Sequence, residues 1–253
     1  MTFFIETLDS RNVIVEKLLN AKGIPTKPIE DCKSAKNKDF LIFAPNKKFD
    51  NTFLNDLSEN LTLISGNLPE SQLKILNAKQ IRHINVMEDE IFAIKNSILT
   101  AEGVLANVLE KTQKSIFEQK FLILGTGRCG KAIAKVFSDL NLDFSLSSFD
   151  EKNFALAHIF SSSNYFKEEV FEVLKNFDVI INTVPAKIIS EEYVKTIKDG
   201  ALYLEIASTQ SINTAQNLQF DYVLCPALPT KYASDTAGKY LFESIIRAIE
   251  KTS

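Results

Sequence analysis

The sequence predicts an α/β protein made of two Rossmann-like domains with parallel sheets, joined by interdomain helices. From residue 121 onward, short apolar runs alternate with amphipathic stretches, and the first 85 residues repeat this alternation more weakly. Such alternation is typical of βαβ units whose parallel sheet is buried on both faces. The chain has 253 residues, of which 45% are hydrophobic, and this is enough for one large domain or two small ones.

The first expected domain covers residues 1–96, and we interpret it as a substrate or dimerisation domain. Its apolar runs predict strands, and its stretches of helical period predict helices. The strands are expected at 2–8, 39–45 and 61–66, and the helices over 11–23 and from about 69.

The stretch 87–112 joins the two domains and is helical in period, with a break expected around 96–100. At this break, Thr100 could cap a second helix. Glu102 would then lie in the first turn, where a carboxylate suits the positive end of the helix dipole.

The second expected domain covers residues 97–236 and binds a dinucleotide. Its strands are expected at 121–125, 143–149, 178–184, 201–208 and 222–226, and its helices over 130–140, 165–177 and 190–200. Beyond it, residues 237–253 have apolar side chains at helical spacing. We expect this last helix to pack back on the first domain.

The motif GTGRCG at 125–130 lies directly after an apolar strand and directly before a helix, which is the context that a dinucleotide fingerprint requires. Gly125 permits the tight turn, Gly127 leaves space for the pyrophosphate, and Gly130 lets helix and strand pack closely. The chain has only eight glycines, so chance produces this pattern in fewer than about one such chain in a hundred. A glycine-rich packing turn without a ligand is the alternative.

The end of the strand at 143–149 bears on the choice of nicotinamide. An acid normally binds the ribose hydroxyls at this position, but here the strand ends in Ser147 and Ser148, with Asp150 slightly late. Small hydroxyl residues tolerate a 2′-phosphate, and Lys152 could assist. We therefore expect NADP, with NAD as the alternative.

Further cofactor contacts are expected from the fingerprint and from the carboxyl ends of later strands, where ligands of open α/β sheets bind. For each residue after the later strands, the alternative is that it only ends the strand and does not contact the cofactor. The expected residues are Thr126, Arg128 and Cys129 in the fingerprint, and Thr183, Val184, Pro185, Ala207 and Ser208 after the later strands.

Two groups of residues are candidates for binding the substrate. Arg11 can bind a carboxylate in bidentate fashion and Asp9 could orient it, although an ordinary helix cap with an exposed arginine is the alternative. Asn96, Ser97, Thr100 and Glu102 cluster at the expected helix break, where a helix start could hold an anion. Capping alone is the alternative for Thr100.

Histidine and cysteine chemistry is not indicated. His83 and His158 both precede the last strands of the second domain, whereas a 2-hydroxyacid dehydrogenase would place a histidine after them. The three cysteines are widely spaced and form no zinc or disulfide pattern, so we expect no metal. Cys129 and Cys225 are interpreted as small apolar residues.

Charge and hydropathy exclude other classes of function. The formal net charge is -3 with acids and bases interspersed, so no basic patch for nucleic acid is expected. No apolar run approaches the length of a membrane span and the first residues lack the features of a signal peptide. We expect a cytoplasmic protein.

Five motifs in order resemble those of the family of dipicolinate synthase A subunits. They are NSILTAEG, GTGRCG, INTVP, LEIAS and PALPTKYASDTAG, within about residues 86–249. The turn LDSR, with Asp9 and Arg11, matches that family's GDxR. On this resemblance, the family's motif residues fall on Asn96, Ser97, Thr100, Glu102, Gly103, Thr236, Ala237 and Gly238.

The resemblance implies a two-domain, NAD(P)-dependent polypeptide related in architecture to alanine dehydrogenase. It would oxidise a dihydrodipicolinate-type intermediate, a small dicarboxylate, to dipicolinate with the flavoprotein-like B subunit of dipicolinate synthase, in the mother cell of a sporulating bacterium. A homo-oligomer is also expected. Arg11 and Thr100 would anchor carboxylates, with Glu102 as a proton acceptor.

The chain departs from the family pattern at several positions. Thr7 and Leu8 replace glycines, Leu99 replaces a proline, Ala227 and Thr230 replace the glycines of PGLPG, and the loop after Ser208 lacks an arginine and glycines. Two other hypotheses therefore stay open. One is another amino or hydroxy acid dehydrogenase of alanine dehydrogenase architecture, and the other is a non-catalytic NAD(P)-binding subunit.

Overall fold

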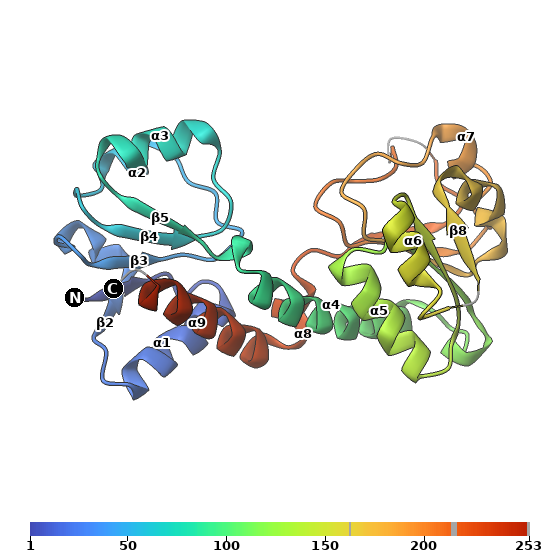
Figure 1. The fold of residues 1–253 in the computed structure, drawn as a ribbon, viewed down its shortest axis with the longest axis horizontal. Helices are drawn as coiled ribbons and strands as arrows, with labels where there is room; N and C mark the ends of the chain where they lie inside the picture. Colours follow the sequence, from blue (N-terminus) through green and yellow to red (C-terminus); the bar gives the residue numbers. More distant parts are fainter. Residues whose placement is uncertain (162, 214–216, 252–253) are drawn as a thin grey trace. The chain divides into compact units, whose positions relative to one another are not determined.

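The computed structural model describes residues 1–161, 163–213 and 217–251, which form two compact α/β units (Figure 1). Unit 1 comprises Met1–Asn96 and Ala233–Ser253, and unit 2 comprises Ser97–Tyr232. Residues 233–236 thus belong with the first unit, although the sequence pattern assigns them to the second domain.

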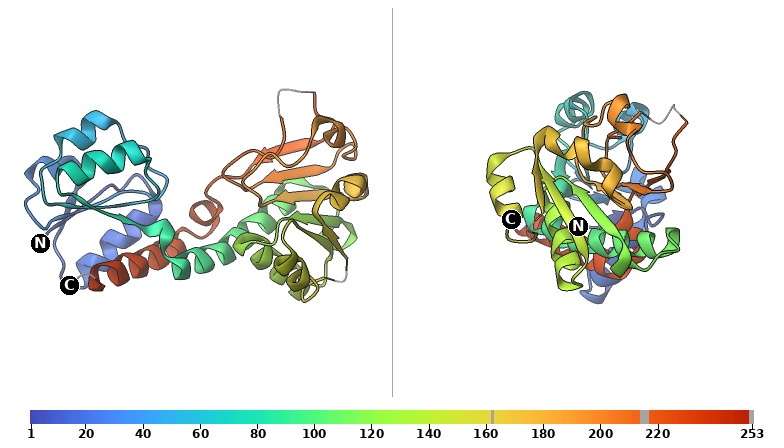
Figure 2. Two further views of the ribbon diagram at one scale, coloured as in Figure 1. Left: turned by 45° about the horizontal axis from the view of Figure 1, so that its top comes forward. Right: turned by 90° about the vertical axis from the view of Figure 1, so that its right-hand side faces the viewer.

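Unit 1 contains a five-stranded parallel sheet in the order β2-β1-β3-β4-β5. Helices α1 and α9 pack on one face, and α2 and α3 lie on the other (Figure 2). The elements are β1 (Phe3–Ile5), α1 (Ser10–Ala21), β2 (Thr26–Pro28), β3 (Phe40–Ile42), α2 (Asn51–Asp56), β4 (Thr62–Ser65), α3 (Glu70–Ala78), β5 (Arg82–Asn85) and α9 (Ser234–Glu250).

The strands of unit 1 are buried on both faces because successive side chains point to opposite sides. Phe3 and Ile5 of β1 pack with α1 and α9, whereas Phe4 packs with α2 and α3. Gly238 allows α9 to lie against α1, since a Cβ there would be 2.5 Å from the Cβ of Ile14. The glycine of the TAG motif therefore serves helix packing.

Helix α4 (Glu90–Lys111) runs without interruption from unit 1 into unit 2. The expected break around 96–100 is wrong, and Thr100 is not a cap. Buried side chains such as Phe92, Leu99 and Val104 hold the helix together across the weak helix formers. Gly103 lies inside it, where a Cβ would be 2.7 Å from the Cβ of Leu228 in α8.

Unit 2 contains a six-stranded parallel sheet in the order β11-β10-β9-β6-β7-β8. Its strand order reverses between β6 and β9. The elements are β6 (Lys120–Leu124), α5 (Arg128–Asp139), β7 (Asp143–Ser148), α6 (Glu151–Ala157), β8 (Asn164–Phe166), a 3₁₀ segment (Lys167–Asn176), β9 (Val179–Asn182), α7 (Glu191–Val194), β10 (Leu202–Glu205), β11 (Asp221–Leu224) and α8 (Leu228–Tyr232).

Three expected helices differ in the structure. The helix expected over 190–200 is shortened to α7 (Glu191–Val194). The helix expected over 165–177 is a short edge strand, β8, followed by the 3₁₀ segment. The helix expected from 237 starts earlier, at Ser234. Nevertheless, the prediction of two α/β domains with parallel sheets is confirmed.

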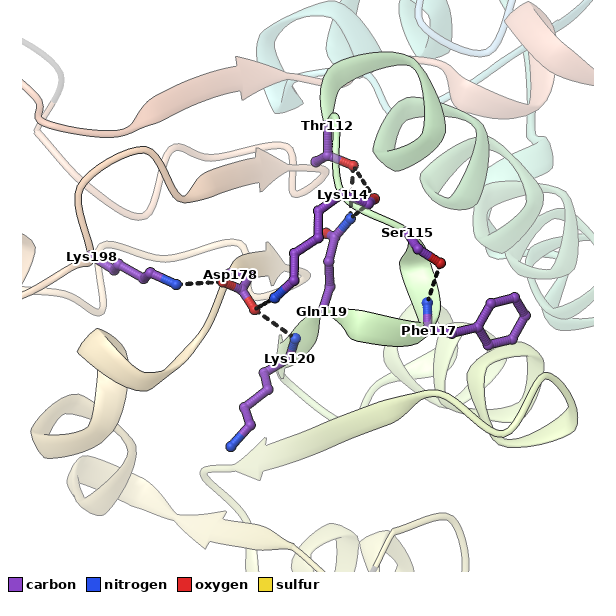
Figure 3. Close-up of polar contacts among 8 residues, drawn as sticks. All are labelled: Thr112, Lys114, Ser115, Phe117, Gln119, Lys120, Asp178 and Lys198. Atoms are coloured by element: carbon purple, nitrogen blue, oxygen red, sulfur yellow. Dashed lines mark hydrogen bonds and ion pairs between the residues drawn. The ribbon is translucent and has the colours of Figure 1, made fainter.

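The amino edge of the second sheet is fastened by polar contacts around Asp178 (Figure 3). Its carboxylate accepts the backbone N–H of Lys120 at 2.9 Å and pairs with Lys114 at 3.3 Å and Lys198 at 2.5 Å. Buried Gln119 donates to Thr112 Oγ1 at 2.8 Å. These contacts tie the end of α4 to the start of β6 and β9.

Candidate dinucleotide-binding site

The three glycines after β6 are required for different physical reasons. Gly125 has φ +97, a left-handed conformation that glycine adopts readily, and a Cβ there would lie 2.5 Å from Thr183 Oγ1. A Cβ on Gly130 would lie 2.0 Å from the carbonyl oxygen of Gly125. Packing within the protein therefore accounts for both residues.

Gly127 is different, because a Cβ there would have no neighbour within 4 Å among the described atoms that surround it. Packing does not explain this glycine, whereas a group approaching its backbone would. Gly127 is the N-cap of α5, whose first backbone N–H groups are oriented for an anion. The exposed Arg128 begins that helix. The loop therefore fits the pyrophosphate of a dinucleotide.

The end of β7 lies beside this loop, but its two serines are buried. Thr126 donates to Ser148 Oγ at 2.8 Å, and Ser148 Oγ donates to the Asp150 carbonyl at 3.0 Å. Ser147 Oγ is buried without a hydrogen-bond partner among the residues that the structure describes. Asp150 caps α6 by accepting from Asn153 N at 2.9 Å. The strand end therefore offers no carboxylate of its own.

A buried polar cluster holds the two loops that follow β9 and β10. Asn182 clamps the first loop, because its amide donates to the Val184 carbonyl at 3.0 Å and accepts from Val184 N at 3.1 Å. The same amide nitrogen donates to Glu205 Oε1 at 2.6 Å. Glu205 Oε2 accepts from Ser211 N at 2.8 Å and from Ser211 Oγ at 2.6 Å.

Glu205 is only 1% exposed, and the groups that donate to it from the described part of the chain are uncharged. One carboxylate thus fixes both loops at the carboxyl edge, where the expected cofactor residues lie. The expectations from sequence do not include Asn182, Glu205 or Ser211. The sequence feature that could have identified Asn182 and Glu205 is a polar side chain in each of two otherwise apolar strands.

The expected residues in these two loops have separate positions. Thr183 donates to the Leu124 carbonyl at 2.8 Å and so supports the turn at Gly125. Val184 and Ala207 are partly buried, whereas Pro185 and Ser208 are exposed. At this edge, Thr183 supports the turn from inside the protein, whereas Pro185 and Ser208 are accessible to a ligand.

Comparison with protein families gives an independent assignment of this region. Residues 73–219 match the model described as "D-isomer specific 2-hydroxyacid dehydrogenase, NAD binding domain", which is more than half of the chain. The chain belongs to this family. A nicotinamide dinucleotide is therefore the cofactor, and the family is one of oxidoreductases.

The chain is also similar to the A subunit of dipicolinate synthase from Bacillus subtilis (strain 168), with 27% identity over 161 residues. That match covers 62% of this chain but only about half, 54%, of the relative's length. The resemblance seen in the motifs is confirmed as a similarity between the two proteins.

Solved structures show the same fold. Dipicolinate synthase A chain from Bacillus subtilis matches 99% of this chain and 95% of its own, with TM-score 0.82 and 19% identity. The corresponding A subunit of dipicolinate synthase from Bacillus halodurans matches 98% and 96%, with TM-score 0.83 and 18% identity. The two-unit fold is therefore shared with these proteins.

In this dehydrogenase-family chain, Asp9 and Arg11 form a closed pair in unit 1. Asp9 caps α1, and Arg11 Nε and Nη2 donate to its two oxygens at 2.9 and 2.7 Å. Burial alone would raise the pKa of Asp9, but the hydrogen bonds and charge of Arg11 lower it. Arg11 is 7% exposed. Asp9 thus orients the guanidinium and occupies hydrogen-bond donors on its Nε and Nη2 atoms.

The candidates on α4 do not form the expected helix start. Thr100 is buried within hydrogen-bonding reach of the Cys129 sulfur, which brings the middle of α4 to the glycine loop. Asn96 is half-buried and Glu102 is exposed. Thr100 therefore supports the cofactor loop from inside the protein and does not present a free anchor.

Burial shifts the pKa values of His83, Cys129 and Cys225. His83 Nε2 lies 3.0 Å from Ser65 Oγ, and burial lowers its pKa. Burial raises the pKa of Cys129, and it raises that of Cys225 to about 11. Among the described residues, no group of three or more His, Cys, Asp or Glu could hold a metal ion. The part of the chain that the structure describes also contains no helix suited to crossing a membrane.

Proposed function

We propose that this chain is the dehydrogenase subunit of a dipicolinate-forming enzyme. It would oxidise a dihydrodipicolinate-type intermediate to pyridine-2,6-dicarboxylate. The observation that carries the proposal is the joint presence of five ordered motifs, sequence similarity over 161 residues and a shared fold. The open Gly127 position supports a bound dinucleotide.

NADP is the proposed cofactor, with NAD as the alternative. Support comes from the end of β7, which carries Ser147 and Ser148 where an acid would bind the ribose hydroxyls. Asp150, the first acid beyond the strand, is engaged in capping α6. The exposed Lys152 lies two residues further and suits a 2′-phosphate.

Within the cofactor site, each residue has a proposed task. Backbone N–H groups at Gly127, Arg128 and Cys129 would bind the pyrophosphate, and Gly125, Thr126 and Gly130 would shape the loop that presents them. Residues after the later strands would line the nicotinamide end: Thr183, Val184, Pro185, Ala207 and Ser208. When bound, a nicotinamide would supply the hydride acceptor for the oxidation.

The substrate residues act by binding and by proton transfer. Asp9 holds Arg11 in a fixed orientation, so that Nη1, which has no hydrogen bond among the described residues, can bind a carboxylate. Glu102 is the proposed proton acceptor because its carboxylate is exposed. Asn96 and Thr100 are assigned to positioning. Aromatisation supplies the driving force, so alignment would supply much of the rate.

Partners and location belong to the same proposal. The flavoprotein-like B subunit of dipicolinate synthase would supply or share the intermediate, and the chain would act as a homo-oligomer in the mother-cell cytoplasm of a spore-forming bacterium. The support is the sequence similarity.

The test is an assay of dihydrodipicolinate oxidation with NADP⁺ or NAD⁺, with and without the flavoprotein-like partner. Arg11→Ala should raise KM strongly and leave cofactor affinity unchanged, whereas Lys22→Ala, at the far end of the same helix, should change neither. An unchanged KM in Arg11→Ala would remove Arg11 from the site. Turnover of another amino or hydroxy acid without a partner would favour the alternative dehydrogenase, and cofactor binding without turnover would favour a non-catalytic role.

A further inference from the structure

The outer edge of β11 in unit 2 carries unpaired backbone groups. This strand ends its sheet and has β10 as its neighbour. The N–H groups of Asp221 and Cys225 each donate to a carbonyl of β10 at 2.9 Å. Because hydrogen-bonding directions alternate along a strand, the N–H and C=O groups of Tyr222 and Leu224 point away from the sheet. Within the described ranges, these four groups have no hydrogen-bond partner.

The opposite edge of the same sheet is protected. There β8 is the outer strand, and the outward N–H of Phe166 donates to the Glu169 carboxylate at 3.0 Å. In unit 1, the edge strand β2 ends in Pro28, which has no N–H group. Natural proteins protect edge strands in such ways because an open edge pairs with another strand. The sequence of β11 has neither a proline nor a lysine, so its edge is suited to a partner strand.

The side chains at this open edge are mainly apolar. Leu224 is 53% exposed, and Tyr222 and Val223 are partly buried. Tyr222 and Leu224 lie on the same face of the sheet, because they are two residues apart in a strand. The Tyr222 ring stacks on that of Tyr203, with 5.6 Å between the centroids, and this contact holds it in place. A partner strand with an apolar side chain beside each of Tyr222 and Leu224 would cover this face.

A second copy of β11 has this pattern. A two-fold axis at Val223 aligns the two strands antiparallel, so that Tyr222 of each copy lies opposite Leu224 of the other. Residues paired in this way exchange two N–H···O=C bonds, and the two pairs therefore use all the unpaired groups of both edges. Opposed residues share a face, so Leu224 of one copy packs on Tyr222 of the other, and such cross-strand contacts stabilise a sheet.

The charges at the two ends of the strand also suit this arrangement. Asp221 of one copy lies opposite Cys225 of the other, so the two carboxylates do not oppose each other. Burial raises the pKa of Cys225 to about 11, while the charges of Lys231 and Lys111 act against this rise, so both lysines lie near Cys225. Lys231 is 3.8 Å from Glu110, whereas Lys111 has no ion pair in the part of the chain that the structure describes. Each Asp221 therefore lies near a cation of the other copy.

We propose that the chain forms a two-fold homodimer in which two β11 strands pair antiparallel and join the second sheets of both copies. This deepens the homo-oligomer of the proposed function by naming its surface, and it rests on the proposed function in that respect alone. The interface consists of residues of unit 2. It requires neither the dinucleotide nor a substrate.

Sedimentation velocity of the full chain over a concentration series tests the dimer. We expect a monomer–dimer equilibrium for the wild type. Leu224→Lys should raise the dimer Kd at least about tenfold, because a lysine on an edge strand opposes pairing. The matched control is Leu109→Lys, at a leucine of unit 2 that is 60% exposed, and it should have no effect. A wild type that is monomeric at about 100 μM, or equal Kd values for the two variants, would overturn the proposal.

Leu224→Pro tests the backbone pairing. It removes an outward N–H but no bond to β10, so it should weaken the dimer while thermal melting shows a folded chain. Hydrogen exchange gives a second readout, since the Tyr222 and Leu224 amides of the wild type should become protected as the protein concentration rises. Exchange that does not depend on concentration would contradict the proposal. Protection that appears only with the flavoprotein-like partner would assign the edge to that subunit and overturn the homodimer.

Val223→Cys tests the position of the two-fold axis. Val223 lies opposite itself in a pair without hydrogen bonds, where the Cα atoms are about 4.5 Å apart, and a disulfide spans this separation. We expect oxidised glutathione to link two copies of Val223→Cys, but neither the wild type nor Leu109→Cys. Equal linking of the two variants would contradict the register. Loss of the oxidation activity in an intact dimer would contradict the proposed function alone, so the two proposals fail separately.

Discussion

The two edges of the second sheet each depend on one carboxylate, but in opposite environments. At the carboxyl edge, Glu205 is buried and accepts hydrogen bonds from uncharged Asn182 and Ser211. At the amino edge, the Asp178 side chain is 17% exposed and pairs with half-exposed Lys114 and Lys198. Partly exposed ion pairs contribute little stability, whereas a buried carboxylate with fixed donors strongly constrains its surroundings.

The two carboxylates therefore have different roles: Asp178 holds strand starts together, whereas Glu205 positions two loops. Asp178 connects the starts of strands and can be replaced at small cost, because water can solvate its partners. Glu205 determines the shape of two loops at the edge where the cofactor binds, and its donors are buried with it. The same chemical group therefore has different consequences at the two ends of one sheet.

The largest expected effect is that of Glu205→Ala. Removing the carboxylate leaves the Ser211 N–H buried without an acceptor and removes one hydrogen-bond partner each from the Asn182 amide and the Ser211 hydroxyl, which should cost about 3 kcal/mol of unfolding free energy. Chemical denaturation measures this, with the exposed Glu192→Ala as control. A cost below about 1 kcal/mol would show that the loops do not depend on Glu205.

Two glycine substitutions at the carboxyl edge distinguish a glycine that leaves room for a ligand from one that the protein's own packing requires. Gly127→Ala meets no protein atom, so stability should change by less than about 0.5 kcal/mol, while NADPH affinity falls about tenfold or more. Gly130→Ala places a Cβ against the Gly125 carbonyl and should destabilise by about 1–3 kcal/mol. Thermal melting and NADPH fluorescence provide the two readouts.

At the amino edge, Asp178→Asn should cost about 1 kcal/mol at pH 7. Burial tends to raise the pKa of Asp178, but hydrogen bonds from Lys198, Lys120 N and Lys114 lower it. A carboxyl with a lowered folded-state pKa stabilises the fold above its unfolded value of about 3.9, and this is lost as pH falls through the folded value. The difference between wild type and variant should therefore shrink below about pH 4. A difference independent of pH would contradict the ion-pair account.

The smallest expected effect is a gain in stability from Ala227→Gly. Ala227 has φ +53, in the left-handed region that favours glycine, and the resembled family has a glycine there. Relieving this strain should stabilise unit 2 by about 1 kcal/mol. Ala132→Gly, inside α5, is the control and should destabilise by a similar amount. Loss of stability in Ala227→Gly would show that the φ angle is not a source of strain.

Much of the fold could be predicted because central strands of parallel sheets consist of short apolar runs. The runs at 121–125 and 178–184 correspond to β6 and β9. Edge strands β2 and β5 could not be predicted in this way, since neither TKP nor RHIN contains an apolar run. Propensity suggests a break near Thr100, but buried packing along α4 overrides it.

The candidate site was predictable only in part. The fingerprint glycines could be identified because their spacing reflects a local turn. The clamp formed by Asn182, Glu205 and Ser211 could not, because it joins the ends of β9 and β10 to the loop after β10. The orientation of Arg11 by Asp9 was expected from the sequence, and the structure adds its geometry, in which Nε and Nη2 donate to the two carboxylate oxygens.

The most direct test of the account is titration of the purified wild type and Gly127→Ala with NADPH and NADH, following nicotinamide fluorescence. We expect enhanced, blue-shifted fluorescence with wild type, stronger binding of NADPH, and weakened binding in the variant at unchanged stability. Failure of the wild type to bind either nucleotide, or equal binding by the variant, would contradict the assignment of the glycine loop as the cofactor site.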